Sequence, residues 1–201
     1  MDSTPLPAQE YTLRSHQQMA AIRAPARQEI LDVLAPMGAA TIAELAVALA
    51  RPADSLYYHV RLLQKAGLIQ AAGSRRSGIH EEALYRTLAP RLRLAYEPGP
   101  QGNAADVTPI IDSMLRLNGR DFRTAMENPA TVVEGPQREL WASRTTAWLS
   151  KEQLEEVNRH MQALLEIMAD SSPEQGRLYA FTMALTPLAR SAKRERTRNP
   201  R

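Results

Sequence analysis

The sequence contains no cysteine among its 201 residues. That absence excludes disulfides, thiolate metal sites, cysteine nucleophiles and thiol-based redox switches together. No apolar run approaches the roughly 18 residues that a membrane-spanning helix needs. The N-terminal stretch MDSTPLPAQE also lacks the apolar core of a signal peptide. We therefore expect a cytoplasmic protein.

The arrangements that support catalysis are missing as well. No nucleophile and base are spaced for covalent chemistry, and there is neither a glycine-rich phosphate loop nor a supported pair of carboxylates. The histidines are scattered along the chain. Glu156 and His160 lie four residues apart on one expected helix, but two ligands without a third make a weak metal site, and a surface hydrogen bond is the better interpretation. We expect no enzyme, no metal site and no cofactor.

The net charge of +3 is unevenly distributed. Residues 1–93 carry net +3, residues 94–189 net −5, and residues 190–201, RSAKRERTRNPR, net +5. This distribution indicates at least two bodies with different partners. The basic tail shows no apolar periodicity, so we expect it to be disordered. It is either a solvated end or an additional non-specific contact with phosphates.

A stretch rich in Pro, Gly and Asn, EPGPQGNAAD, predicts a linker at about 95–104. It divides the chain into an N-terminal domain, residues 1–94, and a C-terminal domain, residues 105–189, followed by the tail at 190–201. We expect the C-terminal domain to dimerise, to sense an effector, or both.

Helical periodicity in the N-terminal domain predicts four helices, at about 15–23, 25–38, 41–49 and 52–66. Thr41 and Glu44 have the spacing of a capping box. After Gly67 the period changes to two, which predicts a strand, a basic loop GSRRSGIHE and a returning strand. Three helices followed by a hairpin with a basic tip is the layout of a winged helix-turn-helix.

The C-terminal domain reads as helix, strand, helix, strand. The strands are ELWASRTTAWL at 139–149 and RLYAFTMALTPL at 177–188, and the second helix follows a Ser150–Gln153 capping box. The predicted fold class is therefore α+β. The large aromatics Trp141, Trp148, Tyr179 and Phe181 could line a small-molecule pocket, but the core of this domain is the favoured interpretation.

In a helix-turn-helix the second helix reads DNA, and here that helix lies in RPADSLYYHVRLLQKAGLI, with Pro52 at or near its first turn. Leu56, Val60 and Leu63 recur at helical spacing and should be buried. The polar, basic and aromatic residues between them then face outward. Arginine can pair with guanine in the major groove, and tyrosine can contact bases, phosphates or a thymine methyl.

The candidate DNA contacts lie at the start of the recognition helix, along that helix and on the hairpin. They are Arg51, Asp54, Ser55, Tyr57, Tyr58, His59, Arg61, Lys65, Arg75, Arg76 and His80. Two of these assignments have strong alternatives. His59 borders the apolar face, so a half-buried, hydrogen-bonded histidine is favoured over a DNA contact. Tyr57 could equally be a packing aromatic.

These residues carry a resemblance to a known family. Residues 11–88 resemble the arsenic-repressor-like (ArsR/SmtB-type) winged helix-turn-helix regulators, through IRAPARQEILDVL, TIAELAVAL, SLYYHVRLLQKAGLI and GSRRSGIHEEALYRT. The stretches WLSKEQLEEVN and LYAFTMALTPL are similar to the α/β extension of one subgroup. Two departures matter: the cysteines of the family's metal sensors are absent, and Arg51 stands where related sequences often have a Ser or Thr helix cap.

The resemblance implies a dimeric transcriptional regulator. We expect a homodimer that binds double-stranded DNA at an inverted repeat, and we expect it to act as a repressor. It could also respond to an unidentified small-molecule effector. Two alternatives stay open: a winged-helix protein-interaction module, and a small-molecule-binding protein without a DNA site.

Overall fold

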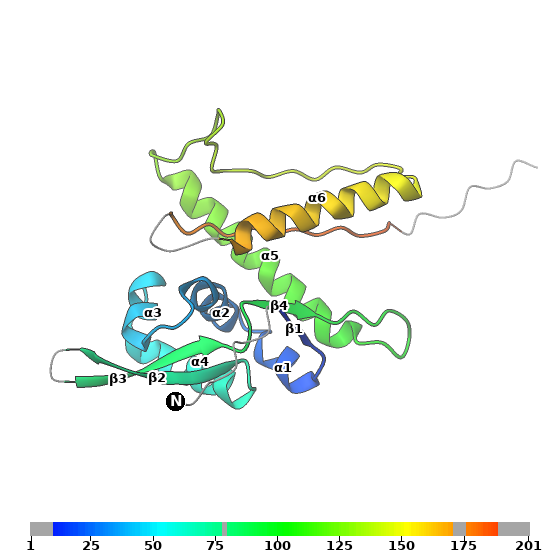
Figure 1. The fold of residues 1–201 in the computed structure, drawn as a ribbon. Coiled ribbons are helices and arrows are strands. Elements are labelled where there is room, and N and C mark those ends of the chain that lie inside the picture. Colours follow the sequence, from blue (N-terminus) through cyan, green and yellow to red (C-terminus); the bar gives the residue numbers. More distant parts are fainter. Residues whose placement is uncertain (1–9, 78–79, 171–175, 189–201) are drawn as a thin grey trace, which may run out of the picture.

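The structure, a computed structural model, describes residues 10–77, 80–170 and 176–188. Its elements, in chain order, are β1 (Glu10–Leu13), α1 (His16–Ala21), α2 (Pro25–Met37), α3 (Ile42–Ala48), α4 (Ala53–Lys65), β2 (Ile69–Ser77), β3 (His80–Thr87), β4 (Arg91–Leu94), α5 (Ala104–Glu127) and α6 (Lys151–Ala169). None of the helices in these residues has the length and apolarity to cross a membrane. Figure 1 shows α1–α4 and the hairpin forming one body, α5 running diagonally away from it, and α6 at the far end.

Local signals in the sequence set the ends of the helices in the first body. Pro25 occupies the first turn of α2, where a backbone N–H would have no partner anyway. Thr41 and Glu44 form both bonds of the expected capping box at the start of α3. Gly67, at φ +70°, follows the end of α4 in the left-handed region that favours glycine. The three helices of the predicted motif are therefore confirmed.

The turn between α3 and α4 has an unusual residue at its centre. Ala50 adopts φ +50°, the left-handed region. Its N–H bonds the carbonyl of Val47 at 3.2 Å, and the N–H of Arg51 bonds the carbonyl of Ala46 at 2.9 Å. These two bonds form a Schellman motif, which ends α3 and sets the direction of α4.

The wing is a longer ladder than the sequence predicted. Strands β2 and β3 pair antiparallel from Ile69↔Thr87 to Ser77↔His80, with an irregularity between Ala71 and Ser74. A bridge between Ala40 and Tyr85 adds a third segment to this sheet. The expected loop over 73–81 is therefore wrong for most of its length. Opposite charges directly across the ladder, at Arg75↔Glu82 and Arg76↔Glu81, favour continued pairing.

Two short strands escaped sequence-based prediction. Strand β1 pairs parallel with β4, with Leu13 opposite Leu94. Leu13 is buried in the same core as α1, α2 and α4. The pairing ties the start of the described chain to the residues just after the wing.

Helix α5 begins where the linker was expected to end, yet its first half belongs to the core of the first body. Val107 and Ile110 are buried in that core. The buried Gln28 of α2 donates to the carbonyls of Ile22 at 2.9 Å and Ile110 at 3.1 Å. Asp106 accepts hydrogen bonds from Arg23 and His16. The core of residues 1–94 therefore continues beyond the predicted boundary.

The C-terminal part departs from the predicted helix–strand–helix–strand order. Both helices are present, and Ser150 and Gln153 form the expected capping box of α6. Residues 139–149 and 177–188 form no strand with any described segment. Alternating large and small side chains predict which faces a strand would have, but a strand also needs a second strand to accept its backbone hydrogen bonds. Neither segment meets such an edge here.

Candidate nucleic-acid interface

Helix α4 is held to its domain by one apolar face. Leu56, Val60 and Leu63 are each at most 1% exposed and lie in the main core. Their spacing of four and three residues places them on one side of the helix. The burial predicted from sequence is therefore confirmed, and it determines which residues of α4 face solvent.

The opposite side of α4 presents a polar and aromatic stripe. Tyr57 is 49% exposed and Tyr58 is 64% exposed. Asp54, Arg61 and Lys65 are also exposed. Asp54, Tyr58, Arg61 and Lys65 follow one another at spacings of four, three and four residues, so they line one face of the helix. Two exposed tyrosines beside an arginine form an unusual surface on the solvent-facing side of a helix.

The start of α4 lies one residue later than the sequence suggested. Pro52, not Arg51, is the N-cap, and no side chain caps the helix there. The hydroxyl of Ser55 instead donates to the carbonyl of Pro52 at 2.7 Å. The backbone N–H groups of the first turn therefore have no side-chain acceptor, and such groups favour an anion such as a phosphate.

Arg51 is engaged with the protein rather than extended into solvent. Its Nη2 donates to Glu29 Oε2 at 2.5 Å, and its side chain is 35% exposed. Arg120 of α5 donates to the other oxygen of Glu29, also at 2.5 Å, and its hydrogen bonds to Glu29 and Asp121 raise the pKa of Arg120. The first residue of the proposed interface is thus connected through one carboxylate to α5.

His59 is half-buried, as favoured from sequence, but the expected hydrogen bond is absent. Its Nδ1 atom is buried and has no partner in the described part of the chain. The ring meets that of Tyr58 edge to face at 5.4 Å between centroids. Burial lowers the pKa of His59 below its ordinary 6.5, and the charges of Arg27 and Arg51 lower it further. The imidazole is therefore neutral at pH 7 and adds no positive charge to the interface.

The wing arginines lie on strand β2 rather than on a loop. Arg75 and Arg76 are both exposed. Arg75 pairs with Glu44 of α3, which holds the wing against the helix-turn-helix. His80 opens β3, but its side chain lies outside the described set. The wing therefore extends basic side chains from the same body that exposes the α4 stripe.

Two acidic residues that position this surface were not among the sequence-predicted candidates. Glu44 accepts the N–H of Thr41 through Oε2 at 2.8 Å and meets Arg75 through Oε1. Its capping role was readable from sequence, whereas its contact with the wing was not. Glu29 gave no local signal, because both of its arginine partners are distant along the chain. Gln64 is a further exposed residue of α4, three residues after Arg61.

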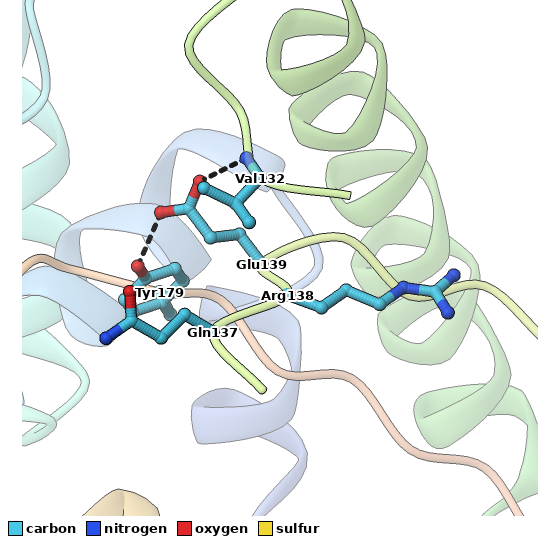
Figure 2. Close-up of a pocket in the computed structure, with 5 residues that line it drawn as sticks. All are labelled: Val132, Gln137, Arg138, Glu139 and Tyr179. Carbon is cyan, nitrogen blue, oxygen red and sulfur yellow. Dashed lines mark hydrogen bonds between the residues drawn. The ribbon is translucent and has the colours of Figure 1, made fainter. Parts of the chain in front are cut away.

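A separate pocket of about 450 Å³ lies in the C-terminal part, lined by Val132, Gln137, Arg138, Glu139 and Tyr179. Figure 2 shows the Glu139 carboxylate at its centre, accepting from the Val132 N–H at 2.9 Å and the Tyr179 hydroxyl at 2.7 Å. Arg177 donates to the same carboxylate at 2.9 Å. These bonds hold the pKa of Glu139 below its ordinary value. Three protein groups already donate to the Glu139 carboxylate. These hydrogen bonds join the segment around Glu139 to the segment around Tyr179.

Neither sequence interpretation of the four aromatics matches the single chain. Trp141 and Trp148 are 71% and 94% exposed, and Tyr179 and Phe181 are about half exposed, so they do not form a core. Of the four, only Tyr179 lines the pocket of Figure 2. The guanidinium of Arg138 lies 4.0 Å from the centre of the Trp141 ring.

Glu156 and His160 lie 3.6 Å apart on α6, as a surface pair. No group of three or more His, Asp or Glu side chains that could hold a metal ion occurs among the described residues. A third ligand is therefore not supplied by the part of the chain that the structure describes.

Residues 24–70 match the sequence model of a family described as a helix-turn-helix domain. The match covers α2, α3, α4 and the start of β2. No curated protein matches the chain. Among solved structures, a double mutant of Lactococcus lactis ZitR in apo form is similar at 17% identity, covering 75% of this chain and 87% of that chain with a TM-score of 0.28. The matched domain, with the exposed stripe of α4, supports a DNA-binding transcriptional regulator.

Proposed function

We propose that the protein is a sequence-specific DNA-binding transcriptional regulator, a repressor, that binds an inverted-repeat operator as a homodimer. The observation that carries this proposal is the division of α4 into two faces. Its apolar residues are buried, while Tyr57, Tyr58 and Arg61 are exposed beside a basic wing. Two tyrosine rings exposed to water forgo the free energy of burying apolar surface, and they regain it when they pack in a nucleic-acid groove.

In this proposal α4 enters the major groove. Arg61 forms a bidentate pair with a guanine, and Tyr58 packs on a base edge or a thymine methyl. Asp54, in the first turn, accepts from a cytosine amine or helps to orient a neighbouring side chain. The uncapped N–H groups of the first turn contact a phosphate, and the Ser55 hydroxyl reaches the same phosphate by turning away from the Pro52 carbonyl. Lys65 reaches the backbone at the far end of the helix.

The wing supplies contacts that do not depend on sequence. Arg75 and Arg76 contact phosphates or the minor groove, and His80 extends the same strand pair. Arg51 donates to Glu29, so its first role is to fix the start of α4. Contact with DNA is its second role. His59, neutral and half-buried, shapes the same face from behind Tyr58.

Two-fold symmetry extends the argument from one helix to an operator. Two copies related by a two-fold axis place their α4 helices in successive major grooves, about 10 base pairs apart. A bound dimer covers that stretch of duplex and excludes other proteins from it. Repression by steric exclusion is the direct consequence.

Selection from random-sequence duplexes with the purified full-length protein tests the proposal. The expected result is a palindrome whose half-sites are centred about 10 base pairs apart. Arg61→Ala should lose the preference at particular positions, and Arg116→Ala, which removes the same charge from an exposed position on α5, should retain it. If no sequence is enriched, the DNA-binding proposal fails and a protein-interaction module becomes the better explanation.

A further inference from the structure

Helix α6 carries an apolar seam that no described residue of its own chain buries. Leu154, Val157, Met161 and Leu164 follow at spacings of three, four and three residues, the pattern by which one helix packs against another. No residue of α6 is buried. Leu154 and Leu164 are 42% and 45% exposed.

The segments 139–149 and 177–188, joined to each other where Arg177 and Tyr179 donate to Glu139, also expose large side chains. Residues 139–149 contain both tryptophans of the protein, Trp141 and Trp148. Residues 177–188 alternate large side chains, with Tyr179 and Phe181 about half exposed. Neither segment pairs with a strand in the described residues, so the backbones of both can still accept a partner strand.

The exposed apolar surface is too large for an isolated chain. The large side chains concerned, each more than 40% exposed, are Trp141, Trp148, Leu149, Leu154, Leu164, Leu165, Ile167, Leu178, Tyr179, Phe181, Leu185 and Leu188. The four aromatic side chains, at about 150–250 Å² each and on average more than half exposed, contribute on the order of 500 Å². The eight smaller leucine and isoleucine side chains raise the exposed apolar area to on the order of 1,000 Å². That exceeds the roughly 300–600 Å² patch of a typical monomer and reaches the ~800 Å² per partner of a standard interface.

We propose that α6 and the segments 139–149 and 177–188 form a dimer interface with the same elements of a second copy. A two-fold interface places one patch against its own copy, so it needs a surface that complements itself. A helical seam meets that condition, since a second α6 presents the same seam. The unpaired segments meet it too, because each copy has the same free strand edges to offer.

The helix dipoles set the relative direction of the two helices. Side-chain charge is about equal at the two ends of α6, because Lys151 offsets one of the three glutamates in the first two turns, and Glu166 is followed by the C-cap Asp170. A parallel pair would bring ends of like dipole sign together, which is unfavourable. An antiparallel pair places the positive N-terminal end of each helix beside the negative C-terminal end of the other. The proposal is therefore an antiparallel α6 pair flanked by extended segments that pair across the two copies.

This inference rests on the proposed homodimer, and it specifies the surface. Its test uses the full chain without DNA, with sedimentation equilibrium and tryptophan emission measured over the same dilution series. Because both tryptophans lie in 139–149, emission reports on this surface alone. The expected result is a dimer with short-wavelength emission that shifts to longer wavelength as the dimer dissociates.

A matched pair of variants tests the seam. Leu164→Glu places a charge on it and should weaken dimerisation at least tenfold. Ala163→Glu adds the same charge beside Arg159 and His160 on the other face and should leave dimerisation unchanged. Circular dichroism checks that both variants keep their helices.

Three results would overturn the proposal. The first is a monomer at every concentration with water-exposed tryptophans, and the second is a monomer with buried tryptophans, which would show that the surface is covered within one chain. The third is a dimer unaffected by Leu164→Glu with exposed tryptophans, which would place the dimer interface elsewhere. In the third case, the homodimer and the enriched palindrome of the proposed function would still stand, so the two failures are distinguishable.

Discussion

The Oε1 atom of Glu29 on α2 lies 2.5 Å from Nη2 of Arg120 on α5, joining residues 91 positions apart. The other oxygen of Glu29 holds Arg51, which precedes the recognition helix. A carboxylate whose side chain is only 13% exposed thus connects the turn of the helix-turn-helix to the helix that leads toward the C-terminal part.

Removing this connection should destabilise the fold. Glu29→Gln leaves Arg51 without its charged acceptor and leaves Arg120 with Asp121 alone, so we expect the free energy of unfolding to fall by about 1–2 kcal/mol. Arg120→Gln should cost less, because Glu29 keeps Arg51 and Arg120 is partly exposed. Urea denaturation measures both, with Arg116→Gln as a control for the loss of one positive charge. Equal stability of Glu29→Gln and the parent protein would contradict a structural role for the pair.

Arg61 should carry base specificity. Arg61→Ala is expected to cost about 1–3 kcal/mol of binding at the selected operator and to relax preference at particular base pairs. Titration of labelled duplexes, each with one altered base pair, measures both effects. A variant that binds more weakly but ranks the duplexes in the parent's order would assign Arg61 to the phosphate backbone.

The wing arginines should act on every sequence alike. Arg75→Ala combined with Arg76→Ala is expected to weaken operator and non-operator binding together. For each phosphate that the variant no longer neutralises, the slope of log affinity against log salt concentration should become shallower by about 0.9. Affinities measured over a salt series give the slope, and Arg116→Ala is a control for the loss of one positive charge outside the wing. An unchanged slope would remove the wing from the interface.

His59 should make stability sensitive to acid. Because burial lowers the pKa of His59 below 6.5 in the folded protein, the unfolded chain binds a proton there more readily. The free energy of unfolding should therefore fall as the pH drops below about 6.5, until the lowered pKa is passed. His59→Gln removes this contribution and should flatten the dependence. Denaturation at several pH values measures it, with His160→Gln as the control, and an unaltered slope in His59→Gln would refute the assignment.

Replacing Ala50 by glycine should stabilise the fold. A left-handed alanine costs about 1–2 kcal/mol, whereas glycine adopts the same conformation freely but loses roughly 0.5–1 kcal/mol in chain entropy. Ala50→Gly is therefore expected to raise the free energy of unfolding by about 0.5–1 kcal/mol. Ala48→Gly, at the end of α3 in ordinary helical geometry, should lower it instead. Thermal or urea denaturation compares the two, and a destabilised Ala50→Gly would mean that the methyl group packs usefully.

The sequence predicted those parts of the fold that depend on nearby residues. Capping boxes, Pro25 and Gly67 act within a few residues, so α2, α3, α4 and α6 could be located from the sequence alone. The burial of Leu56, Val60 and Leu63 followed from helical spacing. The same spacing placed Tyr57, Tyr58 and Arg61 on the exposed face.

Contacts between distant residues could not be obtained in this way. The β1–β4 pairing joins two four-residue segments with no turn between them to signal it. The engagement of Arg51 by Glu29 depends on how α2 packs against the turn, which no spacing encodes. The Thr- and Trp-rich composition of 139–149 and the alternation of large and small side chains in 177–188 predicted strands but not their partners, and a strand exists only when it has a partner.

The buried first half of α5 has a consequence for operator architecture. The helix has 24 residues, so it is about 36 Å long, and its start is fixed in the core. Whatever joins two copies at its far end therefore holds the two recognition helices at a set rotation about the duplex axis, unlike modules on a flexible tether. Half-sites moved apart by about five base pairs would face opposite sides of the DNA. Binding would then depend on the spacing of the two half-sites along the duplex as strongly as on their base sequence.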